Sequence, residues 1–433
     1  MSLTVIGLIG MVILVILLFS RMPVAFSMGL VGFIGIWYIT SLNSAYHVVA
    51  NELWTNFFSY NMCVVPLFVW MGFIALHSGI GERLYIAAYK TIGQLPGGLA
   101  MATEAACAAF GAITGSAIAT TATIGSIGVA EMKKYRYDMS LATASAASGG
   151  ILGALIPPSL LFILYAIMTG ESVGALFIAG IFPGILLTIF YSGSIFLRSW
   201  RTPAIAPTGP HTSFKEKAQA LTGGLAETLI IFFLVMGGLF VGIFTPTEAG
   251  AVGALAVLAV SLIRRQLSWQ GFVKSLGETT GTVAMVLLLV AGAMMMGRFL
   301  GLTRIPYEMT DLIGGLNIPP LAILLLVLVA YFVLGCFIDT LALMLLTVPV
   351  LLPLVTSLGF DLLWFGVLIL LASGMGMITP PVGMGCYVIS GIAKVDLMTV
   401  FRGVWPFIIG NIVCTAVVIA FPEIATFLPS LMS

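Results

Sequence analysis

The sequence predicts an all-α polytopic membrane protein with two inverted-topology repeats, each with five membrane crossings and one re-entrant helical hairpin. Two observations carry this prediction. The chain is too apolar to be covered by water, because 60% of its residues are hydrophobic and its mean hydropathy is +1.17. In addition, one glycine-rich motif that ends in Pro-Pro occurs in both halves of the chain.

The composition also excludes some classes of function. The chain has 17 basic and 16 acidic residues, so its net charge of +1 offers no basic surface to a nucleic acid. The first apolar run, residues 1–20, has no basic residue before it, and Arg21 follows it. This order is typical of a retained first helix rather than of a cleaved signal peptide.

Prolines reveal the internal repeat. Residues 149–158 and 374–381 are the two Pro-Pro motifs, and their first prolines lie 380 − 157 = 223 residues apart. The same offset aligns three further pairs of prolines: Pro23 with Pro246, Pro96 with Pro319 and Pro183 with Pro406. Because prolines bend or end helices, matched prolines indicate matched helix ends. We expect a first repeat over residues 1–205, a cytoplasmic linker over 206–225 and a second repeat over 226–433.

Basic residues orient the first repeat. Lys and Arg favour the cytoplasmic side of short loops, which places Arg21 inside and the N-terminus on the periplasmic side. Residues 98–130 are rich in glycine, alanine and threonine, and the basic run 133–136 that follows them must also stay inside. This segment is therefore predicted to form a re-entrant hairpin. Residues 139–168 then form a helix that is broken at its Pro-Pro pair.

The second repeat takes the opposite orientation, because five crossings in the first repeat invert the second. The charges agree, since only Arg298 and Arg304 among the basic residues fall on the outer side. The second hairpin is expected near residues 305–357, and the second broken helix over 362–390. Inverted repeats with interrupted helices are typical of transporters, with the substrate at the interruptions.

Four places are expected to expose backbone groups at membrane depth: two hairpin tips and two helix breaks. Such backbone is tolerated only where protein or a water-filled cavity satisfies it. Free carbonyls at helix C-termini suit a hard cation, and free N–H groups at N-termini suit an anion. The candidate substrate-binding residues at these places are Thr114, Ser116, Thr340, Thr379, Pro157 and Pro380.

Each candidate has a structural alternative. A Pro-Pro pair could be a plain kink, and a hydroxyl could bond back to the preceding turn and allow close packing. Packing is favoured for Thr120, Thr121 and Thr123, whereas function is favoured for the hydroxyls at the hairpin tips. Two Pro-Pro pairs at equivalent positions favour function over coincidence.

Asp339 is the one charged residue in the run over residues 312–360. A carboxylate at membrane depth is costly and usually functional. It could bind a cation, relay a proton, or cap the second helix of its hairpin. We expect it to be the only charge near either hairpin tip.

Other polar residues do not point to an enzyme. Walker-type loops, Ser-His-Asp sets and metal-like cysteine spacings do not occur in the sequence, so an ion gradient is the expected energy source. The five cysteines are interpreted as reduced packing residues. We expect Glu104, Glu227 and Glu248 to lie near the membrane interfaces. The three histidines, His47, His77 and His211, are expected in or beside loops, which argues against a histidine proton relay.

Four motifs carry a resemblance: residues 111–117, 153–159 and 378–383 at the predicted tips and breaks, and residues 244–251 at the start of the predicted helix 246–263. Through them the chain resembles, over nearly its whole length, the large membrane subunit (DctM type) of tripartite ATP-independent periplasmic (TRAP) transporters. The resemblance implies an elevator-type transport domain that moves against a scaffold, in the cytoplasmic (inner) membrane of a bacterium or archaeon. It also implies three partners: a separate small four-helix membrane subunit, a periplasmic substrate-binding protein and a small organic acid anion.

The resemblance further implies Na+ as the coupling ion, with no other cofactor. Its Na+ sites are built from backbone carbonyls and side chains at the tips and breaks. Carried onto this sequence, they fall on Gly111, Gly115, Gly150 and Gly153 in the first half and on Gly335, Asp339, Gly374 and Gly376 in the second half.

The leading hypothesis is a sodium-coupled permease subunit that imports a carboxylate or sulfonate. The alternative is a stand-alone elevator carrier that takes its substrate directly from solution. A channel or an intramembrane enzyme is disfavoured, because a channel does not need two inverted hairpins and an enzyme needs a nucleophile or metal set. Dicarboxylates, sugar acids, keto acids and sulfonates all suit neutral hydroxyl and backbone groups, so the sequence does not select among them.

Overall fold

The structure is a computed structural model that describes residues 1–433 except 210–211, 309–310, 312–317 and 433. The described residues form helices and connecting turns, and none of them forms a strand. Before the linker, the helices are α1 (Leu3–Phe19), α2 (Val24–Ile39), α3 (Leu42–Phe57), η1 (Tyr60–Cys63), α4 (Val64–His77), α5 (Ile80–Ile92), α6 (Gly98–Thr114), α7 (Ala117–Lys134), α8 (Met139–Leu155), α9 (Leu160–Thr169), α10 (Val173–Arg201) and η2 (Pro203–Ile205). The later helices are α11 (Phe214–Ala220), η3 (Leu221–Leu225), α12 (Ala226–Phe240), α13 (Pro246–Ile263), α14 (Trp269–Thr303), α16 (Pro320–Gly335), α17 (Thr340–Ser357), α18 (Leu362–Met377), α19 (Met384–Ala393), α20 (Leu397–Gly403), α21 (Trp405–Ala420) and α22 (Glu423–Ser430).

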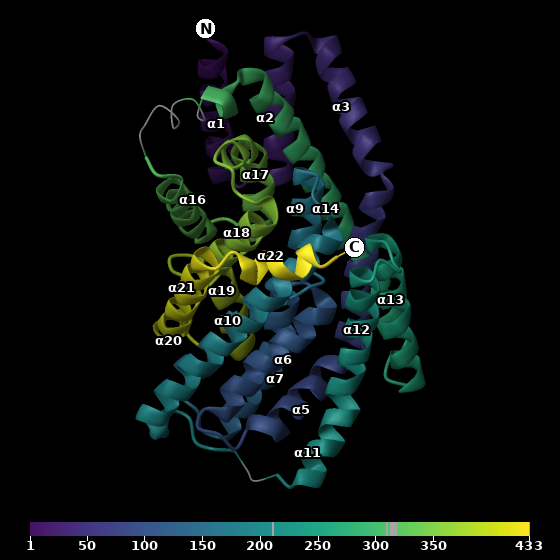
Figure 1. Cartoon of the computed structure of the whole chain (residues 1–433), viewed down its shortest axis with the longest axis vertical. Helices are drawn as coiled ribbons and strands as arrows, with labels where there is room; N and C mark the ends of the chain where they lie inside the picture. The colour runs from purple at the N-terminus through teal and green to yellow at the C-terminus, as the bar shows by residue number, and fades with distance from the viewer. Residues whose placement is uncertain (210–211, 309–310, 312–317, 433) are drawn as a thin grey trace.

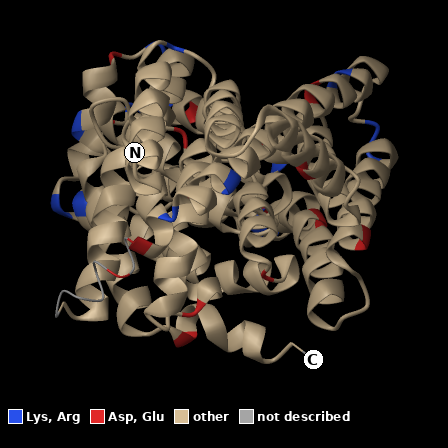
Figure 2. Cartoon of the chain, turned by 90° about the horizontal axis from the view of Figure 1, so that it is seen from above, with Lys and Arg blue, Asp and Glu red and all other residues tan. Residues whose placement is uncertain are grey.

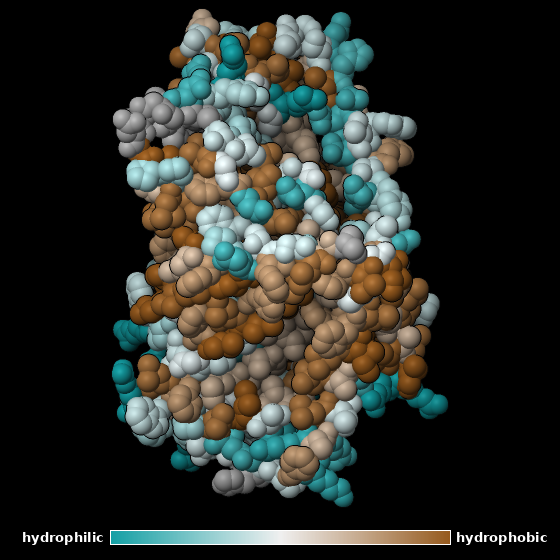
Figure 3. Space-filling view, in the orientation of Figure 1, coloured by the Kyte–Doolittle hydropathy of each residue, from teal (hydrophilic) through white to brown (hydrophobic). Residues whose placement is uncertain are grey.

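Several of these helices can span a membrane. Within the described residues, six helical segments are long and apolar enough, or up to eight if each bent pair counts as one span. The bent pairs are α8 with α9, at 41°, and α20 with α21, at 44°. Charged residues are sparse (Figure 2), and hydrophobic residues cover much of the middle of the surface while hydrophilic residues gather toward both ends (Figure 3). The chain is an all-helical, multi-pass membrane protein.

Two helical hairpins stand where the sequence places them. α6 and α7 form the first and turn at Gly115 and Ser116. α16 and α17 form the second, which begins at Pro320 and therefore later than the expected start near residue 305. Pro319 and Pro320 explain this start, because proline is favoured at the first helical position and cannot continue a preceding helix.

Helix starts in the two halves keep the 223-residue offset. α7 and α17 begin at positions 117 and 340, and α8 and α18 begin at positions 139 and 362; 340 − 117 and 362 − 139 both equal 223. In each case the N-cap side chain accepts a hydrogen bond from a backbone N–H of the first turn. These caps are themselves equivalent pairs: Ser116 with Asp339, and Asp138 with Asp361.

The helices pack in two groups around the hairpins. In the first group α2 packs on α14, α14 packs on α4, and α4 packs on α13. In the second group α6, α7 and α8 form a cluster that α18 and α19 join. In Figure 1, α12 and α13 lie on the right and α16, α20 and α21 on the left. α4 contacts α6, and α14 contacts α17, so each of these two helices meets one hairpin. We call α4 and α14 the wall helices.

Local sequence explains where two helices of the first group begin. Thr245 and Glu248 form a capping box, in which each side chain accepts the other's backbone N–H, and Pro246 is the first residue of α13. This accounts for the motif at residues 244–251 as a helix start. Ser268 caps α14 by accepting the N–H of Gly271 at 3.0 Å.

Candidate substrate cavity

The first hairpin tip is bonded to the first helix break. Gly115 has a φ of +60°, a left-handed conformation that glycine adopts without steric cost. Its carbonyl oxygen accepts the backbone N–H of Leu160, at 3.4 Å, just beyond the Pro-Pro pair. A Cβ on Gly115 would collide with the carbonyl oxygen of Pro158. The tip therefore fits against the break only because residue 115 has no side chain.

The second tip approaches the second break in a similar way. Asp339 caps α17 by accepting the N–H of Leu341 at 3.0 Å. A Cβ on Gly335 would lie 3.0 Å from the carbonyl oxygen of Ser373, and a Cβ on Gly376 would lie 2.5 Å from the carbonyl carbon of Gly335. Backbone thus packs directly on backbone at this break.

A cavity of about 400 Å³ lies between the two tips and the wall helices. The first tip contributes Gly115 and Ser116, and the second contributes Asp339 and Thr340. Gly374 adds part of the second break. Sites for small molecules commonly have volumes of about 300 to 1,000 Å³. The structure therefore gathers both tips and one break around a space that can hold a small molecule.

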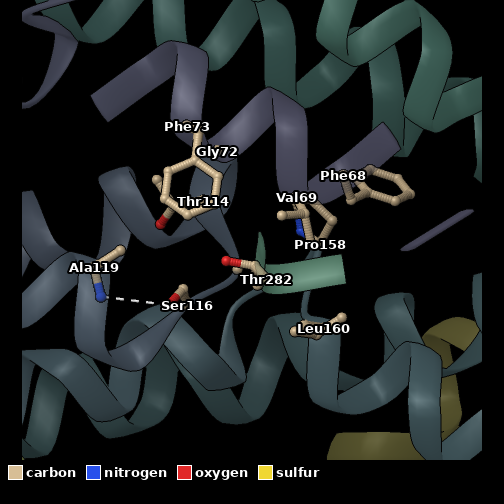
Figure 4. A pocket seen from close by; sticks show the side chains of 11 residues that line it. Phe68, Val69, Gly72, Phe73, Thr114, Ser116, Ala119, Pro158, Leu160 and Thr282 are labelled. Atoms are coloured by element: carbon tan, nitrogen blue, oxygen red, sulfur yellow. Dashed lines mark hydrogen bonds between the residues drawn. The ribbon is translucent and has the colours of Figure 1, made fainter. Parts of the chain in front are cut away.

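A smaller pocket of about 70 Å³ adjoins this cavity on the side of the first tip (Figure 4). Thr114, Ser116 and Pro158 line it together with Thr282 of α14. Figure 4 shows the side chain of Ser116 turned toward Ala119, whose backbone N–H it accepts at 3.3 Å. The first tip and α14 thus face the same small pocket.

The other sequence-selected residues lie outside the linings of these two pockets. Thr379 donates its hydroxyl to the carbonyl oxygen of Met375 at 2.7 Å, which matches the structural alternative for this residue. The hydroxyl of Thr114 likewise donates to the Phe110 carbonyl oxygen at 3.1 Å, although Thr114 lines the smaller pocket. The predicted site residues that line neither pocket are Gly111, Gly150, Gly153, Gly335, Gly376, Thr379, Pro157 and Pro380.

The sequence did not single out the wall-helix residues that line the cavity. Phe73 of α4 and Glu278 and Thr282 of α14 line the main cavity, so the expectation that Asp339 is the only charge near a tip is wrong. His77 ends α4, and its Nε2 lies 2.8 Å from Oε2 of Glu278, while Lys274 lies 3.8 Å from the same carboxylate. An acidic residue ten positions into a long apolar helix was the available signal for Glu278.

Glu104 has a buried side chain. It is fully buried in α6, and one of its oxygens accepts the hydroxyl of Ser148 at 2.8 Å. Glu227 is buried too, and it pairs with Arg83 at 3.1 Å and with Arg264. Glu248 lies in the capping box of α13. Buried carboxylates need such partners, and Glu227 thereby joins α5, α12 and α13.

The chemistry of the main cavity is that of a small polar site in an apolar shell. Its polar lining combines hydroxyls of Ser116, Thr282 and Thr340 with the carboxylates of Glu278 and Asp339. Among the described residues that line it, there is no Lys or Arg. Hydroxyls can donate to an acid group, whereas Asp339 is suited to a cation.

Sequence similarity to known proteins identifies the family. A match to "Tripartite ATP-independent periplasmic transporter, DctM component" covers residues 11–424. The sialic acid TRAP transporter large permease protein of Vibrio cholerae is 33% identical over 96% of both chains. The C4-dicarboxylate TRAP transporter large permease protein of Pseudomonas aeruginosa is 31% identical over 88% of this chain and 89% of that protein.

The fold also resembles that of a solved transporter. The YdaH transporter of Alcanivorax borkumensis superposes with a TM-score of 0.65 at 14% identity, over 89% of this chain and 90% of that chain. This similarity concerns the fold alone. From the match over residues 11–424 and the relatives, the chain belongs to the DctM family, the large permease components of tripartite ATP-independent periplasmic transporters.

Proposed function

We propose that this chain imports a small organic acid anion, a carboxylate or a sulfonate, by coupling its movement to a Na+ gradient. The observation that carries the proposal is the single cavity that both hairpin tips and both wall helices line. The two relatives described above are named as permeases for sialic acid and for C4-dicarboxylates, which are both organic acids. The hydroxyls of the cavity suit such an acid group.

An elevator movement is the mechanism that we propose. The cavity is enclosed on one side by hairpin tips and a break, and on the other side by α4 and α14. If the hairpins and broken helices slide along the wall helices as one body, the bound acid crosses the membrane with them. The predicted inverted repeat would make the two end states alike, and the matched starts of α7 with α17 and of α8 with α18 support it.

The coupling ions are proposed to bind where tips and breaks approach each other. Gly111 packs on Gly153 in the first half, where an added Cβ would lie 2.5 Å from the Gly153 Cα, and Gly335 packs on Gly376 in the second half. Such contacts bring backbone carbonyls together at helix ends, and oxygen ligands suit a hard cation. Asp339 is the nearest carboxylate on a tip, and it would add a charged ligand or balance the ion's charge.

The chain is proposed to work in the inner membrane with its N-terminus in the periplasm. A small four-helix membrane subunit and a periplasmic substrate-binding protein would complete the transporter. The alternative, a stand-alone elevator carrier, differs in one respect that can be measured, because it needs no binding protein.

The test is uptake into liposomes that contain this chain and its small partner. The panel of labelled acids should cover the four chemical classes left open: sialic acid, succinate, pyruvate and isethionate. Each acid is tested with and without an inward Na+ gradient, and with and without the purified binding protein. Uptake that needs both supports the proposal; uptake without the binding protein supports the stand-alone carrier, and uptake that ignores Na+ contradicts sodium coupling.

A further inference from the structure

A second cavity lies on α14, nearer the C-terminal end of that helix than the first. Its volume is about 570 Å³, and its lining includes Glu52 of α3, Arg298 of α14, Met168 of α9 and Pro349 of α17. Arg298 follows Glu278 by 298 − 278 = 20 residues on the same helix, which is roughly 30 Å along the axis. Glu278 and Arg298 are thus separated by about the thickness of the hydrocarbon core. The nearest α14 residues of the two linings, Val286 and Ala293, are 293 − 286 = 7 residues apart, which is roughly 10 Å.

The second cavity lies toward the end of the molecule that carries the N-terminus. Thr4, at the start of α1, donates its hydroxyl to Glu308 at 2.5 Å, and Glu308 follows the end of α14 at Thr303 by a few residues. Arg298 is in the last turns of that helix. In the orientation proposed above, this end faces the periplasm, from which the acid arrives.

Glu52 accepts a hydrogen bond from only one nitrogen of the Arg298 guanidinium. Nε of Arg298 donates to Glu52 Oε1 at 2.7 Å, and the other oxygen of Glu52 accepts from Asn56 at 3.3 Å. In the part of the chain that the structure describes, Arg298 forms no other hydrogen bond or ion pair with a side chain. A guanidinium has five N–H donors in a planar fork, so the four on its two Nη atoms remain available.

A simpler explanation is an exposed ion pair that only joins α3 to α14, and such pairs contribute little to stability. Exposure distinguishes the two partners, however: the side chain of Glu52 is 15% exposed, whereas that of Arg298 is 64% exposed. Glu52 is embedded and held by Asn56, and it presents Arg298 to the cavity. A carboxylate or sulfonate has the geometry to take two parallel N–H bonds from a guanidinium.

Both moving and fixed parts of the proposed mechanism meet at this cavity. Met168 belongs to the helix after the first break, and Pro349 belongs to the second hairpin. A Cβ on Gly297 would lie 3.5 Å from the Cβ of Pro349, so α14 and α17 are in contact beside Arg298. A hairpin that slides along α14 would therefore bring its tip from the level of Glu278 toward the level of Arg298.

We propose that the cavity at Arg298 is an anion-binding site that receives the carboxylate or sulfonate of the cargo before the hairpin tips take it. This inference rests on the proposed function, because it requires an acidic cargo. α14 then places a cation at the arrival end and a carboxylate, Glu278, in the cavity near the other end. The acid is attracted where it enters and is held less tightly where it leaves.

Transport kinetics provide one test, with the complete complex in liposomes under a Na+ gradient. Arg298→Gln should raise the concentration for half-maximal uptake by about tenfold, the usual effect of losing a charged hydrogen bond, with a smaller change in maximal rate. Arg298→Lys should restore part of the loss. Arg304→Gln is the matched control, since Arg304 is the other basic residue at this end and lies outside the cavity lining. Unchanged half-saturation in Arg298→Gln would overturn the proposal.

A second test does not depend on transport. Met294 lines the same cavity one turn before Arg298, and Met294→Cys can be labelled with methanethiosulfonates that carry a sulfonate or a trimethylammonium group. Cys63, the exposed native cysteine, is replaced by serine, and the other four cysteines are buried. Arg298→Gln should lower the ratio of anionic to cationic labelling rates about tenfold, Glu52→Gln should raise it, and Arg304→Gln should leave it nearly unchanged.

The two tests separate failure of the inference from failure of the proposed function. If the wild-type complex takes up none of the four acids, the proposed function fails, and the labelling ratio still decides whether Arg298 creates an anion site. If the wild type transports but neither half-saturation nor the labelling ratio responds to Arg298→Gln, only the inference fails. Assembly with the small subunit, measured by size-exclusion chromatography, must match the wild type in each variant. If Arg298→Gln does not assemble, the ratio of anionic to cationic labelling rates in Glu52→Gln and Arg298→Lys tests the inference instead.

Discussion

Ile151 lies against Gly374, and a Cβ on Gly374 would be 2.7 Å from the Cγ2 atom of Ile151. The two residues differ in number by 374 − 151 = 223, the offset that aligns the two Pro-Pro motifs. In two copies related by a two-fold axis, equivalent residues touch only close to that axis. Both residues also line the central cavity, so the contact locates the proposed axis of the repeat at the cavity wall.

Gly115→Ala should impair transport more than it lowers stability. The added Cβ meets the Pro158 carbonyl oxygen, and the φ of +60° is unfavourable for alanine by about 1 kcal/mol. We expect at least a tenfold lower uptake rate. Gly170→Ala is the control, because Gly170 has a φ of +79° and nothing within 4 Å of an added Cβ. Uptake and thermal unfolding of both variants are compared; equal losses of uptake would mean that backbone strain, and not the tip contact, explains the effect.

Asp339→Asn should weaken ion coupling while it keeps the helix cap. Asparagine caps a helix nearly as well as aspartate, so α17 should remain intact, but the charge on the tip is lost. The expected result is a several-fold rise in the Na+ concentration for half-maximal uptake. Asp361→Asn is the matched control, since Asp361 caps α18 at 2.9 Å and lies outside the cavity lining. Sodium dependence equal to that of the wild type would leave Asp339 with a capping role alone.

Glu278→Gln should make the central cavity hold an acid anion more tightly. Glutamine can keep the contact with His77, but it removes one of the two carboxylates of the lining. Loss of like-charge repulsion should lower the half-saturation concentration for efflux several-fold. Efflux of preloaded acid is the measurement, and Glu131→Gln, which alters an exposed pair with Lys134, is the control. A weaker affinity in Glu278→Gln would show that the carboxylate assists binding.

Glu227→Gln should destabilise the junction of α5 with α12 and α13. Glu227 is 10% exposed and pairs with Arg83, which is 17% exposed, and with the more exposed Arg264. Removing its charge leaves the Arg83 guanidinium poorly compensated in a half-buried place, at a cost of about 2 kcal/mol. Thermal unfolding in detergent measures the loss. Glu131→Gln should change stability by less than about 0.5 kcal/mol, because its partner is exposed.

The parts of the site that break helical rules could be predicted from the sequence. Pro-Pro pairs and glycine-rich tips violate local preferences inside apolar segments, so Gly115, Ser116, Asp339 and Thr340 stood out, and the structure brings these four around one cavity. Such motifs are rare in ordinary membrane-spanning helices, and for that reason the sequence could point to these residues.

The wall of the cavity could not be predicted in this way. Phe73 and Thr282 are ordinary residues of regular helices, and only the packing of α4 and α14 against the tips gives them a place in the lining. The full burial of Glu104 could not be predicted for a related reason: it depends on how α6 and α8 pack, and the sequence of α6 does not fix that. Helix α3 was not expected either, although its Glu52 faces Arg298.

Ser116 and Asp339 cap α7 and α17 from equivalent positions, yet one is a neutral hydroxyl and the other a carboxylate. A perfectly duplicated site would look the same from both ends, and a cargo could settle in it either way round. Because one cap is a neutral hydroxyl and the other a carboxylate, the two ends of this site differ in charge. If the proposed function holds, an acid that travels with a cation would be carried in one fixed orientation, with its acid group toward Ser116 and the ion toward Asp339.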